Sequence, residues 1–219
     1  MSDYDSESEK IWDEYDWERF LQQQDQKTEK YMELLEKYLD HPQRDEIIAR
    51  EMGWSHLSGE NNWSDEVDAL ASEEWRDNDN EADTAESSSE FESFEHHSLY
   101  QAAFALTVWI DQLFDEDEAL QNAPAAVKLA THAALASAKL AAALNDDDLD
   151  EIGMTIAFLK RALKAITTSL EAAAQLLSDR QIKVAQHATL QSRLFEVRDG
   201  IISLMGEYRG EWRRRFGSR

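Results

Sequence analysis

The chain has 219 residues, of which 46 are acidic and 22 are basic, so its formal net charge at pH 7 is −24. Seven glycines and two prolines are too few for a loop-rich all-β protein, and the absence of cysteine excludes a disulfide scaffold and a thiolate metal site. The negative charge disfavours nucleic acid as a partner, because phosphates would be repelled over most of the surface.

The N-terminus and the apolar runs give no sign of a targeting or membrane segment. Residues 1–9 are acidic and polar, and they lack the basic and apolar regions of a signal peptide. The longest uncharged run, residues 96–110, is shorter than the roughly 20 apolar residues that a spanning helix needs. We therefore expect a cytoplasmic protein that does not enter a membrane.

Acidic side chains are concentrated in the first half of the chain. Residues 1–95 hold 30 acidic and 8 basic side chains, whereas residues 96–219 hold 16 acidic and 14 basic ones. Acidity alone favours disorder. Five of the seven tryptophans also lie in the acidic half, and this mixture predicts segments that dock on another surface.

Three helices are predicted in the acidic half. The first covers residues 10–40 and is followed by Pro42, which cannot continue a helix. The second covers residues 44–52, and Gly53 closes it. A third, short helix is expected to run from an N-cap at Ser64 to about Trp75.

The domain organisation follows from a change in composition. Residues 77–89 contain no apolar side chain larger than alanine, which is typical of a disordered linker. The sequence therefore predicts an acidic, Trp-rich helical extension over residues 1–76, this linker over residues 77–89, and a folded domain over residues 90–219.

Two helices are predicted in the first part of the folded domain. Ser89 and Glu92 form a candidate capping box ahead of an apolar face that runs from Leu99 to Leu113. A break at Pro124 precedes an alanine-rich helix over residues 125–144. Small side chains recur every four residues at Ala126, Ala130, Ala134, Ala138 and Ala142, and such a row lets a neighbouring helix approach closely. The adjacent stripe consists of Leu129, Ala133, Ala136 and Leu140.

Two further helices complete the predicted domain. Apolar residues alternate at spacings of three and four, which predicts a helix over residues 148–178 with a heptad seam formed by Leu149, Ile152, Ile156, Leu159, Leu163, Ile166, Leu170, Ala173 and Leu177. The last helix is expected from about Asp179 to Arg215. Four amphipathic helices with short connections predict an all-α, antiparallel up-and-down four-helix bundle, preceded by the acidic extension.

The metal-binding sequence motifs that we considered are missing or lack required residues in this sequence. No histidine of the predicted bundle has a glutamate three residues before it, so the Glu-x-x-His motif of di-iron bundles is missing. The segment that begins at Asp77 resembles the start of an EF-hand loop but lacks its glycine and its bidentate glutamate. We therefore expect no metal, no cofactor and no enzymatic activity.

One catalytic alternative rests on Arg180 and His187, near the start of the last predicted helix. Their spacing resembles the Arg-x(4–6)-His element of HEPN-type ribonucleases. The resemblance implies metal-independent RNA cleavage across a dimer, with His187 as acid and base and Arg180 stabilising the phosphate. The competing interpretation makes His187 a hydrogen-bonded residue at the edge of the core and Arg180 a helix cap or ion-pair partner.

Aromatic residues in the acidic extension are the candidate partner-binding residues. Trp12, Tyr15 and Trp17 lie in one short acidic segment, and Trp54 follows the second predicted helix. Because aromatic anchors dominate interface energetics, they suit an unidentified, basic protein partner. Alternatively, the tryptophans fold back onto the bundle.

The leading prediction is thus a non-catalytic helical interaction or scaffold protein with an acidic, aromatic docking region. A further alternative is an acidic mimic of nucleic acid, which would occupy the basic groove of a nucleic-acid-binding protein. The alanine row and the long last helix of the bundle also offer surfaces for a homodimer.

Overall fold

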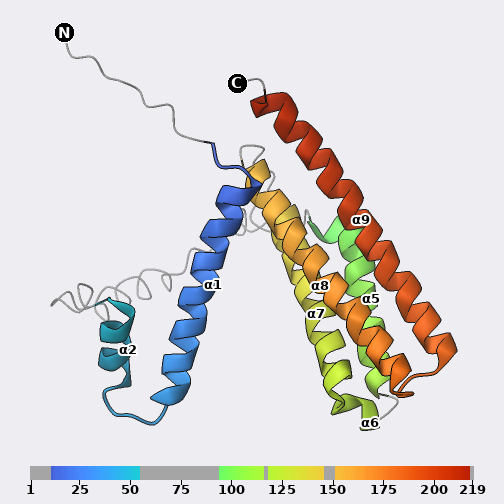
Figure 1. Ribbon diagram of the computed structural model, residues 1–219, viewed down its shortest axis with the longest axis horizontal. Coiled ribbons are helices and arrows are strands. Elements are labelled where there is room, and N and C mark those ends of the chain that lie inside the picture. The colour runs from blue at the N-terminus through green and yellow to red at the C-terminus, as the bar shows by residue number, and fades with distance from the viewer. Residues whose placement is uncertain (1–10, 55–93, 116–117, 146–150, 218–219) are drawn as a thin grey trace, which may run out of the picture. The chain divides into compact units, whose positions relative to one another are not determined.

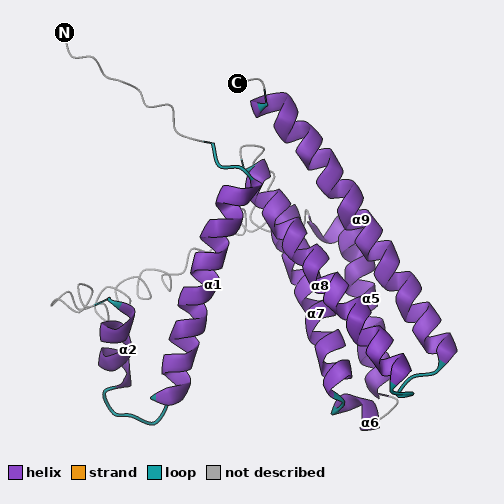
Figure 2. Ribbon diagram, viewed as in Figure 1, coloured by secondary structure: helices purple, strands orange, loops and turns teal. Residues whose placement is uncertain are grey.

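The computed structural model describes residues 11–54, 94–115, 118–145 and 151–217. The regular structure of these residues is helical, with no strand among them (Figure 2). The elements are α1 (Glu14–Lys37), α2 (Arg44–Met52), the 3₁₀ turn η2 (Phe94–His96), α5 (Ser98–Asp115), α6 (Glu118–Gln121), α7 (Pro124–Leu144), α8 (Ile152–Ser178) and α9 (Val184–Phe216). The all-α prediction is confirmed for this part of the chain. None of these helices is both long enough and apolar enough to cross a membrane.

The chain divides into two compact units. The core unit combines residues 1–18 with residues 86–219, and the second unit holds residues 19–85. The boundary falls inside α1, directly after Glu18. The predicted boundaries of the linker at residues 77–89 lie outside the described residues, as do the third predicted helix and the candidate capping box.

Packing in the core unit involves four long helices. Helix α8 contacts α7 and α9, and α5 also contacts α7 and α9 (Figure 1). Their buried side chains form one hydrophobic cluster, whose largest fully buried members are Leu106, Ile110, Leu129, Leu140, Ile152, Ile156, Leu159, Ile166, Leu176, Leu190, Leu194 and Ile201. Full burial of such a side chain contributes about 1.5–3 kcal/mol, so this cluster is the main source of stability.

The predicted alanine row of α7 is only partly its packing face. Ala126 is fully buried, whereas Ala134 and Ala138 are exposed. The predicted adjacent stripe is buried, and the whole buried face consists of Ala126, Leu129, Ala133, Ala136, Ser137, Leu140 and Ala143. This stripe contains the larger leucines of the helix, and burying them removes more apolar surface from water than burying alanines.

Only some of the residues in the predicted heptad seam of α8 are fully buried. The helix begins at Ile152, and Leu163 and Leu170 are only partly buried. Ala162, Ser169 and Leu176, each one residue before a predicted seam position, are fully buried instead. The buried face is wider than a coiled-coil seam because α8 packs against two helices, α7 and α9.

The last helix, α9, begins at Val184 rather than at the predicted Asp179, because a non-helical connection follows α8. Residues 179–183 are not helical, and Arg180 has a left-handed backbone conformation with φ of 57°. Its N–H donates to the carbonyl of Leu177 at 3.0 Å, and the N–H of Gln181 donates to that of Leu176 at 2.9 Å. These two bonds form a Schellman motif, which ends α8 and allows the chain to turn back.

The second unit contains the rest of α1 together with α2. The ammonium group of Lys30 donates to the carbonyl oxygen of Glu51 at 2.5 Å, and the rings of Tyr31 and Trp54 lie 5.9 Å apart. Gly53 follows α2 with φ of 76°, in the left-handed region that favours glycine. The predicted closing role of this glycine is confirmed.

Candidate functional site

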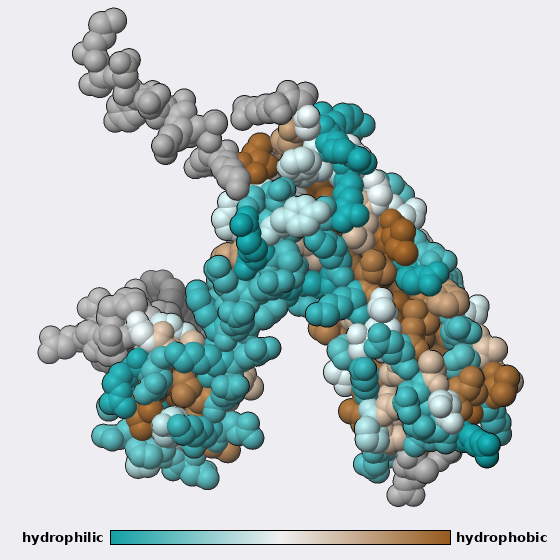
Figure 3. Space-filling model, viewed as in Figure 1, coloured by the Kyte–Doolittle hydropathy of each residue, from teal (hydrophilic) through white to brown (hydrophobic). Residues whose placement is uncertain are grey.

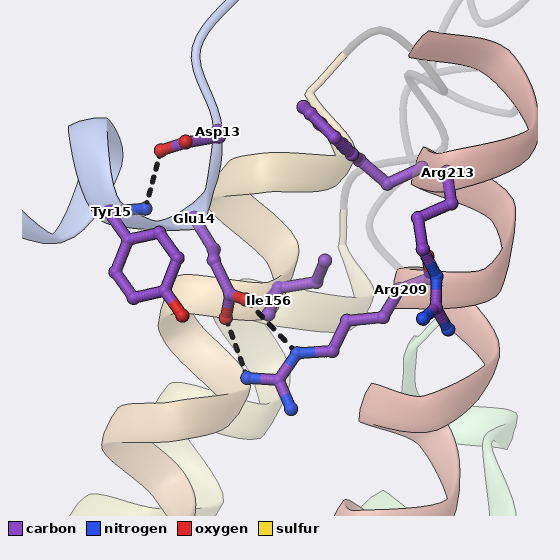
Figure 4. Close-up of a pocket in the computed structure, with 7 residues that line it drawn as sticks. Asp13, Glu14, Tyr15, Ile156, Arg209 and Arg213 are labelled. Atoms are coloured by element: carbon purple, nitrogen blue, oxygen red, sulfur yellow. Dashed lines mark hydrogen bonds and ion pairs between the residues drawn. The ribbon is translucent and has the colours of Figure 1, made fainter. Parts of the chain in front are cut away.

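Residues 12–18, which we call the junction segment, lie against α8 and α9 within the core unit. Asp13 positions this segment by capping α1. Its Oδ1 atom accepts a hydrogen bond from the backbone N–H of Tyr15 at 2.8 Å (Figure 4). The same atom accepts a second bond from the N–H of Asp16, also at 2.8 Å. An aspartate at this position satisfies two N–H groups that have no partner within the helix, so it fixes where α1 begins.

A two-point ion pair connects the first turn of α1 to α9. Arg209 donates from Nε to Oε1 of Glu14 at 3.1 Å and from Nη2 to Oε2 at 2.7 Å (Figure 4). Lys160 of α8 adds a second cation 3.6 Å from Oε2. The Glu14 side chain is only 14% exposed, and its hydrogen bonds raise the pKa of Arg209, against the opposing effect of burial. Arg209 therefore stays cationic, and the paired geometry is the strong form of this interaction.

A second ion pair follows one helical turn later. Arg161 of α8 donates from Nε to Oε2 of Glu18 at 3.2 Å and from Nη2 to Oε1 at 3.4 Å. Glu14 and Glu18 are four residues apart, so both carboxylates lie on one face of α1. The two cations of α8, Lys160 and Arg161, are adjacent in sequence and each contacts one of these carboxylates.

Gly153, in the first turn of α8, provides the space that the junction segment occupies. A Cβ atom at this position would overlap the carbonyl oxygen of Trp12 and lie 2.9 Å from Cδ1 of Trp17. The rings of these two tryptophans meet edge to face, with centroids 4.9 Å apart. Because any side chain would collide with backbone atoms, only glycine lets the segment approach α8 this closely.

A cavity of about 230 Å³ borders the Glu14–Arg209 pair and is lined by Asp13, Glu14, Tyr15, Ile156, Arg209, Trp212 and Arg213. Arg213 lies one turn after Arg209 (Figure 4). Its Nε donates to the carbonyl oxygen of Arg209 at 3.2 Å. The indole Nε1 of Trp212 is buried and has no acceptor among the described residues. These groups can bind carboxylates and aromatic rings. Among the described residues that line it, none is a serine, histidine or cysteine that could act as a nucleophile with its base.

Three of the four predicted partner-binding residues lie together in the junction segment. Trp12 and Tyr15 remain 40% and 62% exposed, and Lys160 Nζ lies 4.6 Å from the centroid of the Tyr15 ring. Trp17 is half-buried. Trp54 belongs to the second unit, where it lies on Tyr31. Partner binding by these residues stays a prediction.

Arg180 and His187 occupy different local elements. Arg180 is exposed in the connection after α8, whereas His187 is half-buried in the first turn of α9. Neither residue lines the cavity beside Glu14. The ribonuclease hypothesis stays a prediction. Within the described residues, no cluster of three or more histidine, aspartate or glutamate side chains could hold a metal ion.

Sequence reasoning did not identify the residues that receive the junction segment: Gly153, Lys160, Arg161 and Arg209. Comparison with known proteins adds no further residues, because no family model, curated protein or solved structure matches the chain. The geometry of the junction is therefore the observation from which a function can be argued.

Proposed function

We propose that the chain is a non-catalytic helical interaction protein whose acidic, aromatic junction segment docks on a basic partner protein. The observation that carries this proposal is the pairing of Glu14 and Glu18 with arginines of neighbouring helices. The segment fits two cationic side chains presented by helices, and a basic partner surface would offer the same groups. The core unit would hold the segment until cations of the partner take the place of Arg161 and Arg209.

The architecture of that scaffold is part of the proposal. We infer that α5, α7, α8 and α9 form an antiparallel up-and-down four-helix bundle. Each of the four packs against two of the others, and only residues 179–183 separate α8 from α9. Short connections of this kind favour antiparallel neighbours.

Exposed aromatic rings beside the paired carboxylates support a docking role. Tyr15 is 62% exposed in the turn that contains Glu14. Trp12, 40% exposed, precedes the cap residue Asp13. Large rings with a polar edge contribute most of the binding energy at many protein interfaces. A basic partner could therefore gain both ring contacts and charge-assisted hydrogen bonds from this segment.

The test is affinity capture from native cells with the full chain and its Tyr15→Ala/Trp12→Ala variant. We expect the wild-type chain to retain a basic protein that the variant loses. Phe104→Ala provides the matched control, because Phe104 is 54% exposed on α5 and lies outside the junction segment. Recovery of the same proteins by all three chains, with equal helicity by circular dichroism, would contradict the proposal.

A further inference from the structure

The face of α8 and α9 that receives the junction segment has the properties of a recognition surface. We propose that it binds acidic, aromatic helix N-termini of other proteins, and that residues 12–18 occupy it within the chain as an exchangeable ligand. The proposal rests on the non-catalytic binding function given above and names a second class of partner for it. The partner is defined by its chemistry, an acidic peptide with aromatic residues.

Charge is the first determinant of this surface. Lys160, Arg161, Arg209 and Arg213 are close to the junction in a chain whose net charge is −24. The first carboxylate of a ligand would meet Arg209 and Lys160, as Glu14 does. A second carboxylate four residues later would meet Arg161. A helix places two such carboxylates on one face with Cβ atoms about 5–6 Å apart, whereas an extended strand would separate them by roughly 13 Å.

Shape is the second determinant, and it favours a peptide over a polyanion such as nucleic acid. Gly153 admits a backbone carbonyl two residues before the first carboxylate, and the ring of Trp17 lies against the same point. The rings of Trp12 and Trp17 pack edge to face there. A phosphate backbone would reproduce the charges but not this close backbone approach.

Exchange is possible because two of the cations that hold the occupant are partly exposed. Arg209 is 41% exposed in its pair with Glu14, and Lys160 is 29% exposed. Partly exposed ion pairs contribute about 1 kcal/mol each even in a favourable geometry, so an outside ligand that offers the same groups can replace them. The attachment of residues 12–18 to the same chain makes their binding intramolecular, so an outside ligand must compete with them. Weakening the internal ligand should therefore open the surface.

The experiment measures binding of a dye-labelled peptide that covers residues 9–22 to the full chain by fluorescence anisotropy. Glu14→Gln/Glu18→Gln weakens the internal segment without changing its size. We expect this variant to bind the peptide at least tenfold more tightly than the wild-type chain does. Adding Arg161→Gln and Arg209→Gln to it should abolish binding. A peptide with glutamine at positions 14 and 18 is the matched control, and we expect it to bind at least tenfold more weakly.

Two results would overturn the proposal. One is equal peptide affinity for the wild-type chain and the Glu14→Gln/Glu18→Gln variant, with helicity unchanged by circular dichroism. The other is displacement of the peptide by a single-stranded oligonucleotide of equal charge as readily as by unlabelled peptide, which would reveal a general anion surface. Either result leaves the capture experiment on Tyr15 and Trp12 unaffected, so the two proposals fail separately.

Discussion

Arg209 binds both carboxylate oxygens of Glu14 although the two residues are 195 positions apart in the sequence. The pair joins the first turn of α1 to the C-terminal part of α9. We expect Glu14→Gln to weaken the junction by about 1 kcal/mol, because the carboxylate charge is lost while the shape is kept. Backbone amides of residues 16–18 should then exchange with deuterium about fivefold faster.

A double-mutant cycle separates this pair from its surroundings. If the pair is the cause, Glu14→Gln combined with Arg209→Gln should accelerate exchange by less than the product of the two single effects. Glu33→Gln is the control, because Glu33 lies on α1 in the second unit. Strictly multiplicative effects would show that Glu14 and Arg209 act independently.

Gly153→Ala should displace the junction segment, since the added methyl group would overlap the Trp12 carbonyl oxygen. Tryptophan emission should report the change, because Trp12 and Trp17 lose their contact with α8. Gly206→Ala is the matched control, because a Cβ there has no heavy atom within 4 Å. In this exposed stretch of α9 the alanine should stabilise the protein by about 0.5–1 kcal/mol. Identical urea midpoints and emission spectra for both variants would count against the close approach at Gly153.

Arg180→Gly should stabilise the protein by roughly 1 kcal/mol. Arg180 has a left-handed backbone conformation, which is unfavourable for a residue with a Cβ atom, whereas glycine adopts it without this penalty. Urea denaturation of the full chain measures the change. Arg180→Ala removes the same side chain but keeps the Cβ, so it should show no such gain. A glycine variant no more stable than the alanine variant would exclude backbone strain at this position.

RNA cleavage by the purified full chain tests the ribonuclease hypothesis directly. Because we propose a non-catalytic function, any slow cleavage should be the same for the wild-type chain and for His187→Ala. Loss of cleavage on substitution of His187, with helicity retained, would instead favour an enzyme.

The C-terminal turn of α9 should respond to acid. Arg214 and Arg215 lower the pKa of Glu211 below its usual value of 4.5, because both guanidinium groups hydrogen-bond its carboxylate. A carboxyl group with a depressed folded-state pKa stabilises the folded state above its unfolded pKa, and this contribution disappears as the pH falls through the folded value. We expect NMR titration to place the Glu211 midpoint below pH 4.5. Substituting both arginines by glutamine should return the midpoint to the usual value, and an unchanged midpoint would argue against these bonds.

Local patterns in the sequence predicted most of the helices but not the junction. The short helix at residues 44–52 has the predicted bounds, because a glycine stop signal and helical spacing are both local. The seam of α8 was only partly correct, since its register depends on two neighbours that the sequence does not identify. Trp12, Tyr15 and Trp17 could be singled out by composition alone.

The other half of the site could not be found in this way. Glu14 is one of 46 acidic residues, and nothing in the sequence distinguishes it as the partner of Arg209. In the sequence, the adjacent cations Lys160 and Arg161 look like residues on an ordinary solvent-exposed helix face. The only signals were the four-residue spacing of Glu14 and Glu18 and a glycine at a helix start, and both features are common on helices that make no such contact.

The ion pairs of the junction make the position of residues 12–18 sensitive to ionic strength. Hydrophobic side chains reach the surface along α9 (Figure 3). Val184 and Ile202 of this helix are exposed. Contacts between such side chains are not screened by simple salt, whereas ion pairs such as Lys160 with Glu14, 3.6 Å apart, weaken as the Debye length falls from about 8 Å at physiological ionic strength to about 3 Å at 1 M. We therefore expect residues 12–18 to stay in place at low ionic strength. At about 1 M salt they should be released while the helices of the core unit stay folded. The salt content of the surrounding fluid would thus set how often the segment is free.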